Sequence, residues 1–250
     1  MRIAFAADIH ANLPAFRAVA SEIDRLGPFD RIINGGDVVL GGLYPGDCVG
    51  MLIDLGWEGV IGNADEIVID SAMGGMLPKA GWPDGLAENE ALQAMARWTA
   101  GKMSHDQIDY LASLPLRIDV AGPSGKTLAF VHATPWGTFP IVWQDADDAG
   151  KVELLDRAGT DALLYGHIHY AYQQQFGDRT LCCAGAVGMP YDRDTRPSFV
   201  IAADEGAGWS FEHVRVDYDH EAYAGELDGA DMPAAESDAR AIRTATFDRR

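Results

Sequence analysis

The chain has 250 residues, of which 48% are hydrophobic and 23% are charged. This composition is typical of a soluble globular protein whose core needs neither disulfides nor structural zinc. The formal net charge of −19 disfavours nucleic acid as a partner, because a negative field repels polyanions. A small phosphate substrate is still compatible with this charge, because bound metal cations reverse its sign locally.

Membrane insertion and secretion are not indicated. No apolar run reaches the ~18 residues that a membrane helix needs, and the apolar run before Asp8 is too short for a signal-peptide core. The three cysteines, Cys48, Cys182 and Cys183, form no even framework and two of them are adjacent. We therefore expect a cytoplasmic protein.

The first quarter of the chain alternates predicted strands and helices. A buried strand spans Arg2–Ala7, and an apolar stripe after the capping residue Asn12 predicts a helix that ends at Gly27-Pro28. Strands are predicted at 31–34 and 59–61, with a helix at 47–55 between them. Strand, helix, strand, helix, strand is the parallel α/β pattern.

The remainder of the chain becomes rich in strands. After an irregular insertion at 71–85, helices are predicted at 87–99, 105–114 and 146–158. Strands are predicted at 116–121, 127–131, 162–165, 170–176, 180–184, 198–203 and 209–216. We expect two packed sheets with outer helices in one domain, residues 1–218. The acidic segment 219–250, with one short helix near 233–243, is interpreted as a solvated tail.

Five short polar clusters stand where predicted strands end. Taken singly, each has an ordinary interpretation as a turn residue, a helix cap or a hydrogen-bonded core histidine. In an α/β sheet, however, ligands bind beyond the carboxyl ends of strands, where all five clusters should meet. Their donors suffice for two metal ions that share one carboxylate, which is typical of phosphate-ester hydrolysis. The clusters are Asp8-Ile9-His10, Gly36-Asp37, Gly62-Asn63-Ala64-Asp65, His132 and Gly166-His167-Ile168-His169.

The spacing within the clusters predicts how the donors reach the metals. Asp8 and His10 are two residues apart, which in an extended chain projects both side chains to one side. His167 and His169 repeat this spacing. Asp37 follows two glycines that permit close backbone approach, and its two oxygens are suited to bridging two cations.

These residues, in this order, resemble the calcineurin-like metallophosphoesterase superfamily. Its signature runs Asp-x-His, Gly-Asp, Gly-Asn-x-Asp/Glu, a lone His and Gly-His-x-His, and the match extends over residues 8–169. The chain length and the segment 185–190 are most similar to the small bacterial and archaeal phosphodiesterase branch. The resemblance implies an α/β fold, namely a two-sheet α/β/β/α sandwich.

The resemblance also implies a ligand set and a reaction. Two first-row divalent cations (Mn, Fe, Ni or Zn) are implied, and such mixed oxygen and nitrogen ligands do not select among them. A metal-bridging hydroxide would attack phosphorus in line. The first metal would be held by Asp8, His10, Asp37 and His169, the second by Asp37, Asn63, His132 and His167, and the implied catalytic residues are His10, Asp37, Asn63 and Asp65.

One position departs from the larger superfamily. Many members carry His where this chain has Ala64, and that His is thought to protonate the leaving group or bind the phosphate. Loss of a general acid costs ~10²–10⁴-fold in rate and matters least when the leaving group is good. Ala64 therefore favours a phosphodiesterase over a phosphomonoesterase or protein phosphatase.

Substrate contacts are less sharply indicated. Arg193 and Arg196 follow the 185–190 turn and are candidates to bind a phosphate oxygen, although a surface role is equally compatible. Tyr44, Trp136 and Phe139 are candidates to stack on a base. A non-catalytic scaffold of the same fold, a phosphomonoesterase or protein phosphatase, and a homo-oligomeric state all stay open, and the natural substrate is not indicated.

Overall fold

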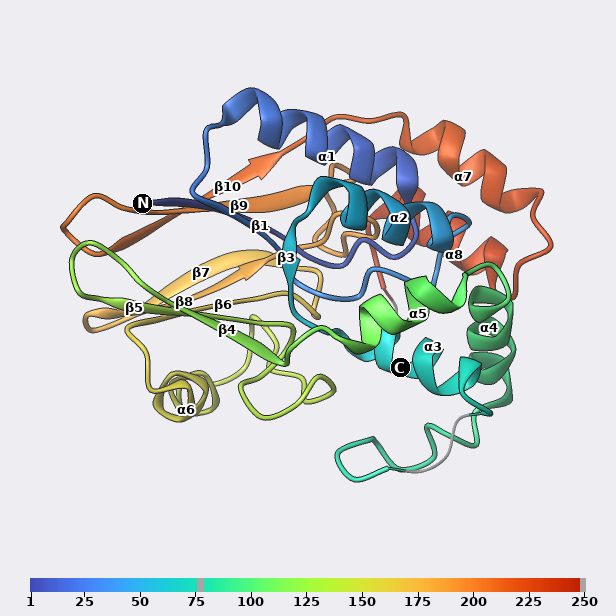
Figure 1. The fold of residues 1–250 in the computed structure, drawn as a ribbon, viewed down its shortest axis with the longest axis horizontal. Helices are drawn as coiled ribbons and strands as arrows, with labels where there is room; N and C mark the ends of the chain where they lie inside the picture. The colour runs from blue at the N-terminus through green and yellow to red at the C-terminus, as the bar shows by residue number, and fades with distance from the viewer. Residues whose placement is uncertain (76–78, 248–250) are drawn as a thin grey trace.

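Two five-stranded sheets form the centre of the computed structural model, which describes residues 1–75 and 79–247 (Figure 1). The first sheet has the order β10-β9-β1-β2-β3. Its strands β1 (Arg2–Ala6), β2 (Arg31–Asn34) and β3 (Glu58–Gly59) run parallel. Strands β9 (Ser198–Asp204) and β10 (Trp209–Arg215) are antiparallel additions at one edge.

The second sheet has the order β4-β5-β6-β8-β7. Strands β5 (Thr127–Val131), β6 (Ala162–Tyr165) and β8 (Arg179–Ala184) are parallel. Strands β4 (Arg117–Ala121) and β7 (Ala171–Phe176) pair antiparallel at the two edges. Each sheet thus contains three adjacent parallel strands, β1-β2-β3 in the first and β5-β6-β8 in the second, whose carboxyl ends point the same way within each sheet.

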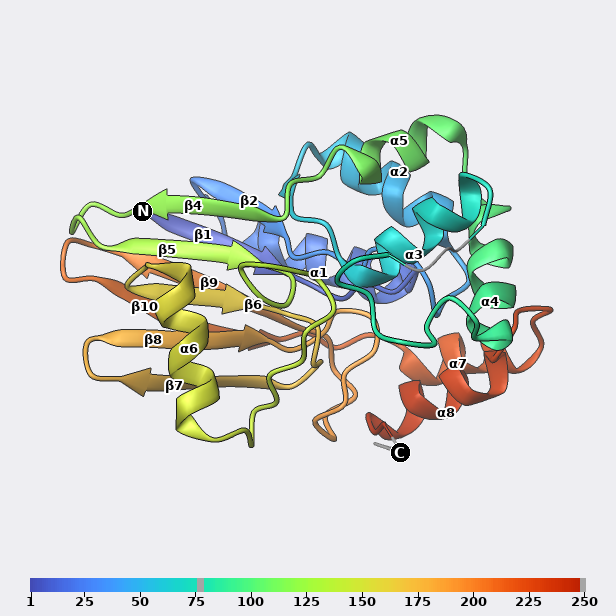
Figure 2. The same cartoon turned by 90° about the horizontal axis from the view of Figure 1, so that it is seen from below.

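Side-chain alternation places the sheets face to face. Ile3 and Phe5 of β1 point into the core between the sheets, where the rings of Phe5 and Phe130 lie 5.5 Å apart. Ala4 and Ala6 point to the opposite face, which α1 (Leu13–Leu26) and α2 (Pro45–Leu55) cover. Helix α6 (Asp148–Ala158) covers the outer face of the second sheet (Figure 2). The predicted α/β/β/α sandwich is confirmed.

Within the described residues, five further helices, α3 to α5 and α7 to α8, complete the fold and lie beside the sandwich (Figure 1). Helices α3 (Asn63–Ala72), α4 (Glu90–Ala100) and α5 (His105–Ala112) lie between β3 and β4 in the sequence. Helix α3 was not predicted, because its run of apolar residues, 67–69, is short and has acidic residues on both sides. The predicted insertion at 71–85 begins inside this helix, and its residues 76–78 lie outside the described part of the chain.

The C-terminal segment contains two helices, α7 (His220–Asp228) and α8 (Ala235–Thr244), where the sequence predicts one. Its interpretation as a solvated tail is wrong. Tyr223, Leu227 and Ile242 are buried in a core of their own together with Met189. Among the described residues, no helix is long and apolar enough to cross a membrane.

Candidate metal centre

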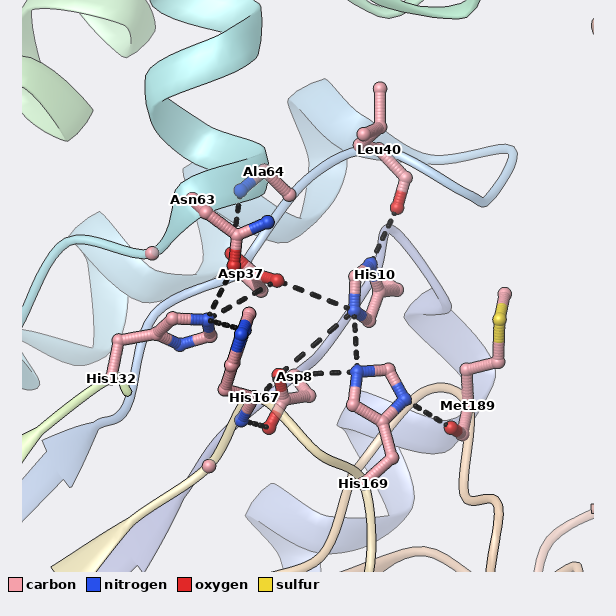
Figure 3. A network of polar contacts seen from close by, with 12 residues as sticks. Asp8, His10, Asp37, Leu40, Asn63, Ala64, His132, His167, His169 and Met189 are labelled. Carbon is pink, nitrogen blue, oxygen red and sulfur yellow. Dashed lines mark hydrogen bonds and ion pairs between the residues drawn. The ribbon is translucent and has the colours of Figure 1, made fainter. Parts of the chain in front are cut away.

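The predicted ligands meet at the carboxyl ends of the parallel strands (Figure 3). Asp8 and His10 follow β1, Asp37 follows β2, His132 follows β5, and His167 and His169 follow β6. Two groups of donor atoms result, each with all its atoms within 4.8 Å of one another. The first group is Asp8, His10 and His169, and the second is Asp37, His132 and His167.

The backbone of the ligand loops is left-handed, not extended as predicted. Asp8 and His10 have φ values of 59° and 47°, and Asp37, His167 and His169 have values of 53°, 67° and 59°. Non-glycine residues seldom adopt this region, and such strain is concentrated at functional sites. The pairs spaced two residues apart thus converge through tight turns.

The first group places two imidazole lone pairs against each other. His10 Nδ1 donates to the Leu40 carbonyl at 2.8 Å, and His169 Nδ1 donates to the Met189 carbonyl at 2.6 Å. A neutral imidazole carries one N–H, so both Nε2 atoms are unprotonated acceptors. They lie 3.1 Å apart, and His169 Nε2 is 3.3 Å from Asp8 Oδ1. A cation between these atoms satisfies all of them.

The second group repeats this arrangement. His132 Nδ1 donates to the Gly35 carbonyl at 2.9 Å, which leaves the Nε2 of the neutral imidazole as an acceptor. That atom faces His167 Nδ1 at 3.1 Å and the amide oxygen of Asn63 at 2.9 Å. Asn63, the first residue of α3, therefore adds a neutral oxygen to this group. All seven predicted metal ligands lie at the centre.

Asp37 connects the groups through one oxygen atom. Its Oδ2 lies 3.7 Å from His10 Nε2 and 3.4 Å from His132 Nε2. Its Oδ1 instead accepts the backbone N–H of Ala64 at 2.8 Å. Oδ2 thus faces both groups, while the backbone donor orients Oδ1, which keeps a second acceptor site. The expected bridge through both oxygens stays a prediction.

Two glycines permit this close packing. A Cβ on Gly62 would lie 2.1 Å from both the nitrogen and Oδ1 of Asp37. A Cβ on Gly166 would lie 2.4 Å from Asp8 Oδ2. A side chain at either position would therefore collide with a ligand carboxylate, which explains glycine at both.

Burial and mutual charge shape the ionisation of the centre. Burial alone would raise the pKa of Asp37, but the charge and hydrogen bond of His132 hold it well below its usual range. Burial opposes protonation of His132, yet in the metal-free protein Asp37 raises its pKa to about 9. His132 Nε2 therefore carries a proton toward Asp37 when no metal is present, and it becomes an acceptor only when a cation displaces that proton. Burial and the neighbouring His132 lower the pKa of His167 to about 4. The centre therefore attracts positive charge most strongly around Asp37.

Asp65 lies beneath the centre, where it accepts four backbone N–H groups. Its Oδ2 accepts from Asp37 at 2.9 Å and from Gly62 at 3.0 Å. Its Oδ1 accepts from Val38 at 2.9 Å and from Val39 at 3.2 Å. The side chain is fully buried and joins the loop after β2 to the start of α3.

The predicted substrate residues are placed less favourably. Arg196 binds Asp194 through its guanidinium, at 2.9 and 2.7 Å. Arg193 is exposed, and its backbone N–H donates to the Ala245 carbonyl at 2.9 Å. The hydroxyl of Tyr44 donates to Glu226. The structure thus pairs two of these three side chains with acids of their own.

The C-terminal segment supports the ligand loops, which the sequence did not indicate. The Tyr223 hydroxyl accepts the Leu43 N–H at 3.2 Å, and the Tyr218 hydroxyl accepts from Asn12 at 3.0 Å. Tyr191 stacks on His169 with ring centroids 4.4 Å apart, and Phe247 in turn stacks on Tyr191 with ring centroids 5.0 Å apart. The sequence also did not predict the backbone carbonyls that fix the imidazole tautomers, because every residue type has a backbone carbonyl.

A two-sheet sandwich with two ligand groups sharing one aspartate defines a metal-dependent phosphoesterase. Residues 1–206 match the calcineurin-like phosphoesterase superfamily domain, and the chain belongs to this family of metal-dependent phosphoric ester hydrolases.

Its relatives are similar over nearly their whole length. An uncharacterized protein of Methanocaldococcus jannaschii is 28% identical over 232 residues, which cover 87% of this chain and 88% of that protein. A metallophosphoesterase structure from Sphaerobacter thermophilus is 25% identical with a TM-score of 0.73, covering 98% of this chain and 99% of the other. A hypothetical protein from Pyrococcus horikoshii shares the fold, with a TM-score of 0.81, 20% identity and 98% coverage of both chains.

Proposed function

We propose that the protein is a dinuclear metal-dependent phosphodiesterase that hydrolyses small nucleotide-type or other phosphodiesters. The observation that carries this proposal is the pair of ligand groups that share Asp37 Oδ2. His10 Nε2 and His169 Nε2 lie 3.1 Å apart, and His132 Nε2 and His167 Nδ1 approach equally closely. Deprotonated imidazole nitrogens at this spacing beside a carboxylate are metal ligands, so the residues present fit two divalent ions.

The ligand assignment follows from these contacts. Asp8, His10, His169 and Asp37 would hold one ion, and Asp37, Asn63, His132 and His167 the other. When bound, the two ions supply Lewis-acid polarisation of phosphate and water. These donors do not select among Mn, Fe, Ni and Zn.

The surrounding chain keeps the ligands in place. Asp8 is oriented by the backbone N–H of His167, at 3.1 and 2.9 Å from its two oxygens. Asp37 is oriented by the Ala64 N–H, and Asp65 fixes the backbone of Asp37. We therefore assign Asp65 a positioning role, and His10, Asp37 and Asn63 a role through the metals.

The preference for diesters rests on Ala64. This residue is buried and presents a methyl group where many relatives present an imidazole. Asp65 cannot replace that proton donor, because it is fully buried and both its oxygens already accept two backbone N–H groups each. Substrates whose leaving group needs little protonation are then favoured. The buried, unbridged cysteines support a cytoplasmic setting.

A metal-by-substrate screen tests the proposal. Metal-stripped protein is reloaded with Mn²⁺, Fe²⁺, Ni²⁺ or Zn²⁺ and assayed on bis(4-nitrophenyl) phosphate and on 4-nitrophenyl phosphate. We expect metal-dependent turnover with a higher kcat/KM for the diester, and loss of that turnover in Asp37→Asn. A strong preference for the monoester would instead support a phosphomonoesterase, and absence of metal binding would support a scaffold.

A further inference from the structure

A cavity of about 400 Å³ is lined by residues that closely follow two ligands of the second group in sequence, namely Glu66 after Asn63 and Trp136 after His132. It is bounded by the start of α3, by the loop that follows β5 and by the loop before α4. Helix α3 begins at Asn63, and Glu66 lies three residues further, ~4.5 Å along the helix axis. Trp136 follows His132 by four residues, so at most ~14 Å of chain separates them. The cavity is therefore within reach of a group attached to a phosphate at the metals.

Aromatic side chains form the walls of this cavity. Trp82, Trp136 and Phe139 line it, and the rings of Trp82 and Phe139 lie 5.4 Å apart. Aromatic faces stack on nucleobases, with a free energy of ~1–3 kcal/mol per base. The volume exceeds that of one planar heterocycle.

Glu66 is the charged side chain among the described residues that line the cavity. Its Oε1 accepts the Thr138 hydroxyl at 3.0 Å, and its Oε2 accepts the Trp82 indole N–H at 3.3 Å. Each carboxylate oxygen accepts two hydrogen bonds, so both retain acceptor capacity. This carboxylate is held in a fixed place and suits a ligand that offers N–H donors.

The charges around the cavity decide between two kinds of organic group. An acid among aromatic rings also suits a quaternary ammonium group. Here, however, the guanidinium of Arg157 lies 3.4 Å from the ring centroid of Trp136 and occupies one face of the indole. That positive charge disfavours a second cation on the same ring, whereas a neutral planar heterocycle is unaffected.

We infer that this cavity is the subsite for a nucleobase carrying an exocyclic amino group, which Glu66 recognises and the aromatic side chains stack against. The inference rests on the proposed phosphodiesterase function and names its substrate class as nucleoside phosphodiesters. Glu66 and Trp136 are specificity-determining residues in this scheme and hold no metal.

Four esters with the same 4-nitrophenolate leaving group test the inference. They are the 4-nitrophenyl phosphate diesters of adenosine, purine riboside, methanol and choline. Purine riboside differs from adenosine by the missing amino group. Metal-loaded wild type should show a kcat/KM for the adenosine ester about tenfold or more above that for the methyl ester.

Two variants separate recognition of the amino group from stacking. Glu66→Gln should lower kcat/KM for the adenosine ester about tenfold and should change the purine riboside ester little. Trp136→Leu should lower both nucleoside esters. The methyl ester should stay within about twofold of wild type in each variant, which also reports an intact metal centre. Glu205→Gln, at the exposed β9–β10 turn, is the matched control.

The outcomes distinguish the inference from the proposed function. Equal turnover of the adenosine and methyl esters, or a Glu66→Gln effect of equal size on all four, overturns the inference alone. A preference for the choline ester that Glu66→Gln abolishes replaces the nucleobase with a cationic group. No turnover of any ester by metal-loaded wild type refutes the phosphodiesterase proposal and the inference with it. Phe139→Leu substitutes for Trp136→Leu if the latter does not fold.

Discussion

Replacement of Asp65 by Asn should separate support of the metal centre from contact with the metals. The carboxylate accepts four backbone N–H groups, two on each oxygen. An Asn side chain keeps one oxygen as an acceptor and turns an NH₂ group toward the other two donors. Two charge-assisted hydrogen bonds are lost, and two buried N–H groups face a donor.

The expected loss is large for a nearly isosteric change. At 1.5–3 kcal/mol for each hydrogen bond to a charged group, Asp65→Asn should lower the free energy of unfolding by about 3–6 kcal/mol. For a protein of this size, that corresponds to a fall in Tm of roughly 6–24 °C. The backbone of Asp37 loses its partner in the same step, so metal affinity and kcat should fall as well.

Thermal unfolding of the metal-free protein, followed by metal titration, measures both effects. Asp109→Asn, an exposed acid on α5, serves as the control and should change Tm little. A Tm for Asp65→Asn within about 2 °C of wild type would refute the role given to this carboxylate. A normal Tm with lost activity would instead indicate that Asp65 contacts the substrate.

Three further changes have defined outcomes. Gly62→Ala places a Cβ 2.1 Å from Asp37 and should lower kcat ~10²-fold, with reduced metal content by elemental analysis; wild-type metal content would contradict the steric argument. Burial raises the pKa of Asp238 to about 7, compared with ~3.9 in the unfolded chain. The folded state therefore keeps the proton to a higher pH than the unfolded state does, and the free energy of unfolding falls as pH rises from 4 to 7. Asp238→Asn should therefore gain up to about 4 kcal/mol over wild type at pH 8 and nothing below pH 4, measured by urea unfolding across that range; a gain independent of pH would exclude this carboxyl as the cause. Tyr223→Phe removes the acceptor of the Leu43 N–H and should cost about 1 kcal/mol in the same urea assay, whereas no loss would mean that water replaces the hydroxyl.

The sequence was sufficient to identify the fold and the donors at the centre. Strand periodicity is local, and polar residues at strand ends converge wherever parallel strands do. Asp37 and His132 could therefore be expected to lie close together, although they are 95 residues apart in the sequence. Helix α3 was missed because its apolar run is short and has acidic residues on both sides. Its start is fixed by Asp65, which accepts the N–H of Gly62 and, from a distant loop, those of Asp37 and Val38.

Other features depended on the folded structure. The tautomers of His10 and His169 are set by the backbone carbonyls of Leu40 and Met189. Every residue type has such a carbonyl, so the sequence does not show which one accepts the bond. The shared oxygen of Asp37 follows from the Ala64 N–H, again a backbone group. Arg196 was a reasonable phosphate ligand in sequence, but Asp194 two residues earlier satisfies it.

The bracing of the ligand loops by the C-terminal segment imposes an order on how the enzyme is made. Asp8, His10 and Asp37 are synthesised well before Tyr218 and Tyr223, which follow all seven ligands in the chain. The loops at Asn12 and Leu43 gain these tyrosine partners only then. A nascent chain thus exposes its donors before its loops are fixed, and the mature geometry is completed after the last ligand has left the ribosome.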